Sequence, residues 1–152
     1  MGTERFQEEK MDIIAKSGRE VQEDAFAIRH KVFMEEQGYR NEFDEFDDTC
    51  GYVALYVNGT AVGTGRFFPS EADGKIAVFG RIAVLKEYRG QELGRKIMEE
   101  LEKAAKKEGF CGAVLTAQEY AVPFYEKCGF SLSDDEILYD EGNPHRRMEK
   151  YF

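Results

Sequence analysis

The segment from Gly80 to Lys107 constrains the fold most, because it joins a strand pattern to a helix pattern through a short loop with two glycines. Residues 82–85 form an apolar run with β-branched side chains, which is typical of a buried strand. Residues 93–105 place apolar side chains at spacings of three and four, which predicts a helix with one face on a core. The segment therefore predicts a strand that leads directly into a packed helix.

The loop between these two elements is predicted to bind an anion. Gly90 and Gly94 lie at the helix entrance, where the first amides have no partner within the helix and the helix dipole favours negative charge. We therefore expect a phosphate-bearing ligand at residues 89–95. The glycine spacing excludes both the dinucleotide motif G-x-G-x-x-G and the nucleotide motif G-x-x-x-x-G-K-[ST].

The other patterns predict one mixed sheet. Strands are expected at residues 10–16, 52–57, 61–68, 76–85, 112–118, 130–132 and 146–152, and helices at 20–36, 93–107 and 120–127. Asn58-Gly59 predicts a hairpin, and the Gly142-Asn143-Pro144 segment a turn before the last strand. A helix between strands 76–85 and 112–118 makes these two strands parallel. We expect a single α+β domain over residues 1–152, with a mostly antiparallel sheet flanked by helices.

The composition limits the function classes. A net charge of −9 argues against sequence-independent nucleic-acid binding and against adsorption to anionic membranes. No apolar stretch approaches the roughly 20 residues that span a bilayer, and residues 1–10 lack the apolar core of a signal peptide. Three cysteines without a C-x-x-C pair, together with two histidines, predict neither a metal site nor a disulfide framework. We expect a cytoplasmic protein, and the sequence leaves a homodimer open.

An acidic run at residues 42–48 carries five carboxylates interleaved with Phe43 and Phe46. Such a run is ordinarily a solvated loop, but the phenylalanines indicate that this one is pinned to the body of the protein. Arg66 and Arg81 lie on predicted central strands. Each can pair with this acidic run or with an acidic group on a substrate.

Two motifs in order point to a known family. Residues 84–90 read V-L-K-E-Y-R-G, and residues 121–130 match the pattern A-x-x-F-Y-x-x-x-G-F about 30 residues later. With both motifs, the chain resembles the GNAT family of N-acetyltransferases over nearly its whole length. It is also similar to a bacterial subgroup with R-x-x-V-F-x-x-E-Q, here residues 29–37, and an acid-x-G-x-P-H-x-x-M pattern, here residues 140–148.

The resemblance implies the GNAT fold and a direct transfer of an acetyl group from acetyl-coenzyme A to a primary amine, on a small molecule or a protein, without a metal. The implied coenzyme contacts are Ile82, Ala83, Val84, Arg89, Gly90, Gln91, Glu92, Leu93, Gly94 and Arg95. The backbone of residues 82–84 would pair with the pantetheine arm and supply an oxyanion donor, and the loop amides would hold the pyrophosphate. Tyr125 stands at the family's general-acid position, which suits a phenol with a pKa of about 10.

The general base and the acceptor contacts are less well specified. His145 is a candidate base because imidazole titrates near neutral pH, although a histidine after Pro144 can equally cap a turn. Glu36, Glu119 or a chain of waters are alternatives. We expect the acceptor to contact Arg29, Glu36, Arg81 and Gln118.

Glu92 departs from the family pattern, which has glycine at this position of the R/Q-x-x-G-x-G/A loop. Glycine usually marks a positive φ or a close backbone approach, and a carboxylate would repel a pyrophosphate. We expect acetyl-coenzyme A to bind, but more weakly than it binds a Glu92→Gly variant.

Two alternatives to an amine acetyltransferase are a non-catalytic acyl-coenzyme A sensor with a degenerate loop, and acyl transfer of the autoinducer-synthase kind. The presence of Tyr125 favours an enzyme over a sensor, and the absence of tryptophan weighs against the synthase.

Overall fold

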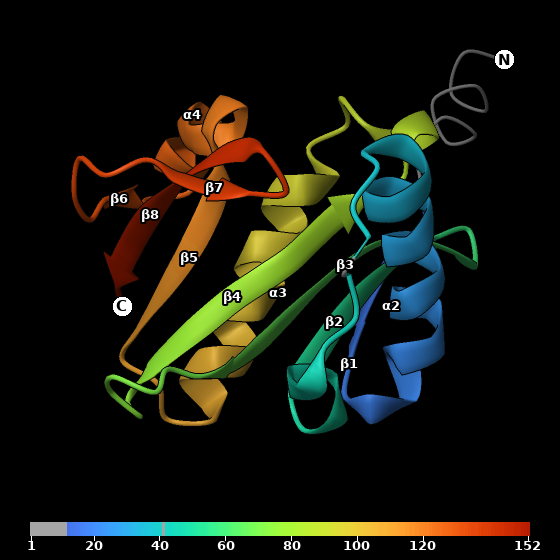
Figure 1. The fold of residues 1–152 in the computed structure, drawn as a ribbon. Coiled ribbons are helices and arrows are strands. Elements are labelled where there is room, and N and C mark those ends of the chain that lie inside the picture. The colour runs from blue at the N-terminus through green and yellow to red at the C-terminus, as the bar shows by residue number, and fades with distance from the viewer. Residues whose placement is uncertain (1–11, 41) are drawn as a thin grey trace, which may run out of the picture.

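The computed structural model describes residues 12–40 and 42–152. Residues 10 and 11 of the first expected strand, and the signal-peptide expectation on residues 1–10, lie outside the described residues. One eight-stranded sheet runs through the described part in the order β1-β2-β3-β4-β5-β8-β6, with β7 paired to β8 (Figure 1). The strands are β1 (Ile13–Ser17), β2 (Gly51–Val57), β3 (Thr60–Pro69), β4 (Ile76–Val84), β5 (Gly112–Gln118), β6 (Ser131–Leu132), β7 (Leu138–Asp140) and β8 (Asn143–Tyr151).

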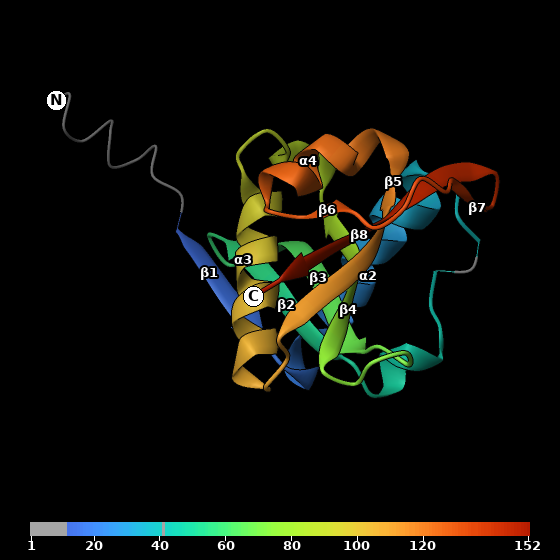
Figure 2. The same ribbon diagram turned by 90° about the vertical axis from the view of Figure 1, so that its left-hand side faces the viewer.

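Helices cover both faces of this sheet. The elements are η1 (Arg19–Val21), α2 (Gln22–Arg29), η2 (His30–Glu36), η3 (Glu45–Asp48), η4 (Lys86–Tyr88), α3 (Leu93–Lys107), η5 (Glu119–Ala121) and α4 (Val122–Lys127). Figure 2 shows α3 and α2 on opposite sides of the sheet. The predicted helix over 20–36 is helical throughout, but it starts as a 3-10 turn and ends as the π-helix η2, a change of winding that apolar spacing does not reveal.

The larger core lies between the sheet and α3, whose Ile97 and Leu101 are fully buried. Two glycines of β3 let the helix approach closely. A Cβ on Gly63 would lie 2.8 Å from the Ile97 side chain, and one on Gly65 would lie 2.9 Å from that of Leu101. Side chains at these two positions would therefore push α3 away from the sheet.

The parallel pair β4–β5 is confirmed, but it is short. Residues 76–78 pair with residues 112–114, and the two strands then diverge. All other strand pairs are antiparallel, so the predicted mixed sheet with a central parallel pair is confirmed. A bulge at Arg81, with φ 51°, bends β4 in the part that has no β5 partner. The divergence opens a space between the carboxyl ends of β4 and β5.

The last hairpin differs from the prediction. The turn expected at 142–144 is displaced toward the N-terminus, because the strand β8 begins at Asn143 and includes Pro144. The turn is made by Glu141 and Gly142, with φ of 50° and 84°, and it follows the unpredicted strand β7. Asn58 and Gly59 have φ of 50° and 87°, which confirms the first hairpin. A glutamate in the left-handed region is a weaker turn signal than asparagine, and this explains the error.

Candidate active site

A cavity of about 620 Å³ lies where β4 and β5 diverge, a volume typical of small-molecule sites. It receives side chains from both faces of the sheet. The predicted site residues that line it are Arg81, Ile82, Ala83, Val84, Arg89, Gly90, Glu92, Leu93, Gly94, Arg95, Gln118, Tyr125 and His145. Gln91, Arg29 and Glu36 are not among its lining residues. One cavity thus brings together residues that are far apart in the sequence.

The loop before α3 contains two residues in the left-handed region of backbone conformation. Gly90 and Glu92 both have positive φ, 82° and 61°. No carbonyl or side chain in the described part of the chain accepts a hydrogen bond from the amides of residues 93–95. These amides and the positive end of the α3 dipole make the loop suitable for an anion. At a φ of 61°, Glu92 has the left-handed conformation that glycine adopts most easily.

Arg89 fastens this loop to the end of η2. Its guanidinium makes two hydrogen bonds to the Glu36 carboxylate, one of them 2.7 Å long, and its Nε donates to the Val84 carbonyl at 3.0 Å. The hydrogen bonds from Arg89 lower the pKa of Glu36. A carboxylate with a lowered pKa is a weaker base, so this geometry suits Glu36 to holding the loop.

Tyr125 lies on α4 and faces the cavity, between the rings of Phe124 and Phe130 at centroid distances of 5.0 and 6.4 Å. Burial raises the pKa of its phenol, which therefore stays protonated at neutral pH. Its hydroxyl has no hydrogen-bond partner among the described side chains and backbone groups, so it is available to a ligand. The residue has the chemical properties of a proton donor.

His145 lies on β8 opposite Gln118, lines the cavity and is 8% exposed. Its Nδ1 lies 2.9 Å from the carbonyl oxygen of Asn143. Because a carbonyl only accepts, Nδ1 carries the proton, and in the neutral form of the ring the lone pair is on Nε2. The ring thus caps the turn and also has a nitrogen that can accept a proton. The alternative base Glu119 does not line the cavity and lies 3.8 Å from the guanidinium of Arg146.

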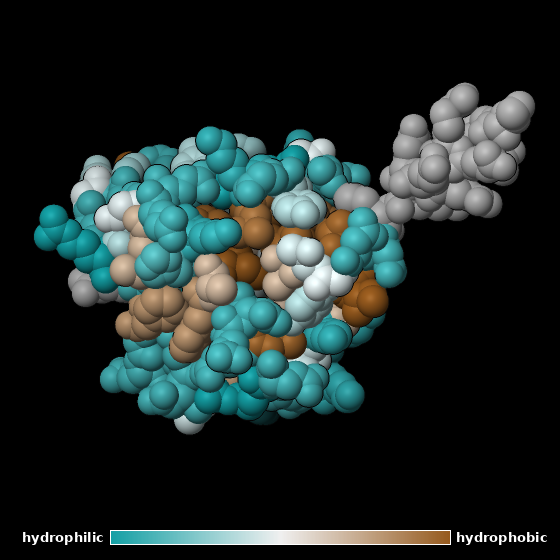
Figure 3. Space-filling view, turned by 90° about the vertical axis from the view of Figure 1, so that its right-hand side faces the viewer, coloured by the Kyte–Doolittle hydropathy of each residue, from teal (hydrophilic) through white to brown (hydrophobic). Residues whose placement is uncertain are grey.

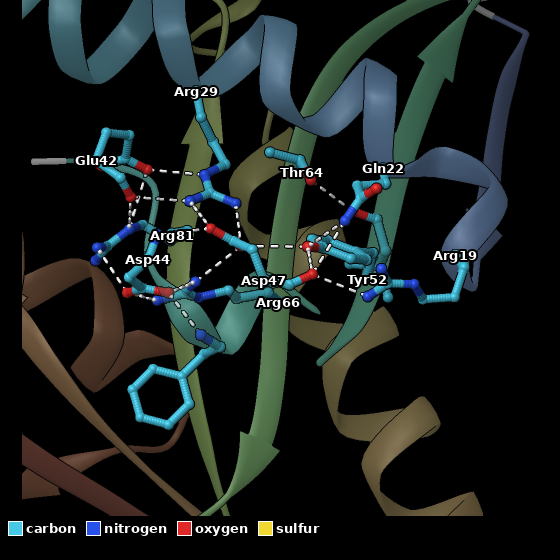
Figure 4. A network of polar contacts seen from close by, with 12 residues as sticks. Arg19, Gln22, Arg29, Glu42, Asp44, Asp47, Tyr52, Thr64, Arg66 and Arg81 are labelled. Atoms are coloured by element: carbon cyan, nitrogen blue, oxygen red, sulfur yellow. Dashed lines mark hydrogen bonds and ion pairs between the residues drawn. The ribbon is translucent and has the colours of Figure 1, made fainter. Parts of the chain in front are cut away.

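Arg29, expected to contact the acceptor, instead anchors the acidic run (Figure 4). It is 1% exposed, and its guanidinium donates to Glu42 at 2.8 Å and to Asp47 at 2.7 Å. Burial alone would raise the pKa of Asp47, but hydrogen bonds from Arg29 hold it well below its usual range. The positive charge of Arg29 is therefore compensated by carboxylates of the acidic run.

Arg66 and Arg81 also pair with the acidic run rather than standing free. Arg66 donates to Asp44 at 2.7 Å and to Asp47 at 2.8 Å. The Arg81 Nε lies 3.0 Å from the Glu42 carboxylate, and its Nη2 lies 3.2 Å from Asp44. Burial raises the pKa of Glu42 despite these arginines. Arg29, Arg66 and Arg81 thus form one network with three carboxylates of the run 42–48 (Figure 4).

Phenylalanines pin the acidic run, as the sequence predicts. Phe46 stacks on Phe68 with ring centroids 4.1 Å apart and an interplanar angle of 5°, and Phe43 lies 4.8 Å from Phe26. The face of the molecule seen from the right-hand side of Figure 1 is mostly hydrophilic, with hydrophobic side chains gathered in patches near its middle (Figure 3). These ring contacts fix the run in place, and its first residue, Glu42, lines the cavity.

Sequence reasoning missed several cavity residues. Tyr39, Tyr120 and Asp140 line the cavity, from the loop after η2, from η5 and from β7. Asp140 belongs to the acid-x-G motif and could have been singled out by it. Tyr39 lies in an irregular loop and Tyr120 on a single 3-10 turn, and both are too short for periodicity to give the direction of a side chain.

Two kinds of feature are absent from the described residues. None of their helices is both long and apolar enough to cross a membrane. No three of their His, Cys, Asp or Glu side chains are arranged to hold a metal ion.

Comparison with known proteins places this geometry in a family. The sequence model of the acetyltransferase (GNAT) family matches residues 17–130. The uncharacterized N-acetyltransferase YjcF of Bacillus subtilis (strain 168) is 38% identical over 140 residues, which cover 91% of this chain and 97% of that protein.

Solved structures agree. A putative N-acetyltransferase from Lactobacillus plantarum has a TM-score of 0.81 and 32% identity, covering 93% of this chain and 97% of that one. Escherichia coli ElaA has a TM-score of 0.79 at 22% identity, covering 93% and 99% of the two chains, and so supports the fold alone.

Proposed function

Because the chain belongs to the acetyltransferase (GNAT) family, we propose that it moves an acetyl group from acetyl-coenzyme A to a primary amine by direct attack in a ternary complex. The observation that carries this proposal is the single cavity that Tyr125, His145 and the loop before α3 share. The acyl donor supplies a thioester, whose acyl group is transferred as the thiol departs. The acceptor supplies an amine that must lose a proton.

The donor half of the cavity fits the coenzyme in two respects. The unpartnered amides of residues 93–95 suit its pyrophosphate, with Arg95 and Lys127 as nearby cations. Beyond Val78, β4 has no β5 residue paired to it, so its backbone groups on that side are open to an extended chain such as pantetheine. We propose that residues 82–84 bind this arm and that an amide of Ala83 or Val84 stabilises negative charge on the carbonyl oxygen.

Two side chains would manage the protons. His145 Nε2 accepts a proton from the attacking amine, directly or through water, and Tyr125 gives its phenolic proton to the departing thiolate. The bond from the amine nitrogen to the carbonyl carbon forms as the carbon–sulfur bond breaks. The chain itself is not acylated in this scheme.

The test of this role is a Tyr125→Phe variant, which keeps the ring but removes the proton donor. We expect its kcat to fall roughly a hundredfold while its KM for acetyl-coenzyme A changes little, because a general acid acts on the transition state. Thiol release from acetyl-coenzyme A with a panel of amines measures both quantities. Tyr151→Phe is the matched control, since Tyr151 is 70% exposed and outside the cavity.

A Tyr125→Phe variant as active as the wild type would exclude the general-acid role. Absence of turnover with every amine class, together with tight coenzyme binding, would instead support a non-catalytic acyl-coenzyme A sensor.

A further inference from the structure

The acceptor end of the cavity, formed by Phe33, Tyr39, Glu42, Asp140 and His145, lies on the α2 side of the sheet. Arg81 also lines this cavity, but its positive charge is already paired with carboxylates of the protein. The Arg81 guanidinium is held by the Glu42 carboxylate at 3.0 Å, the Glu42 carbonyl at 2.9 Å and the Asp44 carboxylate at 3.2 Å. An acidic acceptor would gain little net attraction from an arginine whose charge is already matched by carboxylates. The acceptor end therefore does not favour a carboxylate-bearing amine.

Asp140 is different, because no cation in the described part of the chain pairs with it. Glu42, the other carboxylate of the acceptor end, already binds Arg29 and Arg81. The loop that carries Tyr39 is joined to the turn after Asp140 by the hydrogen bond from the Arg40 amide to the Glu141 carboxylate. Tyr39 and Asp140 both line the cavity. The charge of Asp140 adds to the effect of burial, which raises the pKa of the Tyr39 phenol. The acceptor end thus presents one uncompensated negative charge.

Aromatic rings accompany this carboxylate. Tyr39 packs edge-on against Phe33 with ring centroids 6.4 Å apart, and Tyr120 lines the cavity from η5. Ring faces attract ammonium groups, more strongly at a half-buried ring such as Tyr39 than at Tyr120, which is 75% exposed. A carboxylate beside aromatic rings is therefore suited to a second cationic group rather than to a neutral chain.

Two hydrogen bonds tie the walls of the acceptor end together. Gln118 Nε2 donates to Gln37 Oε1 at 2.8 Å, joining β5 to the end of η2. The Arg40 amide donates to the Glu141 carboxylate at 3.0 Å, joining the loop after η2 to the turn between β7 and β8. These links join the segments around a cavity whose volume of about 620 Å³ lies in the range of small-molecule sites, which favours a small acceptor.

We propose that the acceptor is a small amine with a second positive charge, which Asp140 and the ring of Tyr39 bind while the reacting amine lies near His145. This inference rests on the proposed acetyl transfer and specifies its substrate class. The charges at the two ends of the cavity are then complementary to the two substrates. Arg95 and Lys127 face the phosphates of the donor, and Asp140 faces the cation.

The test compares three acceptors with the same four-carbon chain: diaminobutane, aminobutanol and aminobutanoate. Thiol release at saturating acetyl-coenzyme A gives kcat/KM for each. Asp140 is exposed, so its charge is partly screened by solvent. We expect the diamine to exceed the alcohol by roughly fivefold, the upper end for an exposed charge pair, and the acid to be poorest. Added salt should reduce the advantage of the diamine.

Asp140→Asn should reduce the ratio of kcat/KM for diamine over alcohol to about one, mainly through KM for the diamine. Asp135→Asn is the matched control, since it removes the same charge from an exposed residue of the preceding segment that does not line the cavity, and it should leave the ratio unchanged.

A wild-type ratio of one or below, or an unchanged ratio in Asp140→Asn, would overturn this inference. Turnover with other amines but with none of these three would overturn it while leaving acetyl transfer intact. Absence of turnover with every amine would overturn both.

Discussion

Glu92 shows how one residue can affect both stability and coenzyme binding. Its φ of 61° is left-handed, which costs a residue with a side chain about 1 to 2 kcal/mol relative to the right-handed regions. Glycine would remove this cost but would lose more chain entropy on folding, by about 0.5 to 1 kcal/mol. We therefore expect Glu92→Gly to unfold with a free energy equal to or slightly above that of the wild type, and to bind acetyl-coenzyme A more tightly.

Glu92→Gln separates the two causes, because it removes the charge and keeps the side chain at a positive φ. Calorimetric titration of the three proteins with acetyl-coenzyme A gives the affinities, and urea unfolding gives the stabilities. If charge repulsion dominates, Gln and Gly tighten binding equally. Equal affinities in all three proteins would show that the Glu92 side chain points harmlessly away from the phosphates.

At the scale of elements, the ion-pair network holds the acidic run against the sheet. Asp47 is 4% exposed and pairs with both Arg29 and Arg66, so Asp47→Asn would leave two buried arginines without full compensation. We expect this variant to lose about 3 kcal/mol of unfolding free energy, as is common when one partner of a buried pair is removed. Urea unfolding followed by circular dichroism measures this loss.

Asp48→Asn is the matched control for that measurement. Asp48 is the exposed neighbour on the same 3-10 turn, and the same substitution there should change stability by less than about 0.5 kcal/mol. Equal effects of the two substitutions would mean that the run is held by its phenylalanines and not by its charges.

At the scale of the whole molecule, the network predicts how stability depends on pH. Hydrogen bonds from arginines outweigh burial and lower the folded-state pKa of Asp44 and Asp47. A lowered pKa contributes stability that is complete above the unfolded value of about 3.9 and is lost as the pH falls through the folded value. Burial raises the folded-state pKa of Glu42, so this carboxylate has the opposite effect on stability. It lowers the free energy of unfolding at pH values above its unfolded pKa of about 4.3.

We therefore expect the free energy of unfolding to fall most steeply below about pH 4, and the dependence to be shallower in Asp47→Asn. Urea midpoints measured between about pH 6 and pH 3 test this expectation. Parallel curves for the wild type and the variant would show that Asp47 does not carry the acid sensitivity.

Local patterns were sufficient for most of the architecture. Apolar spacing predicts α3, and two residues with a strong left-handed preference predict the hairpin at Asn58-Gly59. The parallel pairing of β4 with β5 follows from the helix that connects them, because a crossover leaves little choice of direction. The family motifs likewise predict the loop before α3 and Tyr125, since each motif is contiguous in the chain.

Only the tertiary structure decided which charges are free. Arg29 finds Glu42 and Asp47 at separations of 13 and 18 residues, and Arg81 finds the same run at a separation of 39. In the sequence these arginines look as suitable for a substrate as any other, and the motif that contains Asp140 does not show whether its charge is paired. An ion pair depends on distances across the fold, which residue spacing does not encode. The compensation of Arg81 and the uncompensated charge of Asp140 are therefore properties of the folded chain.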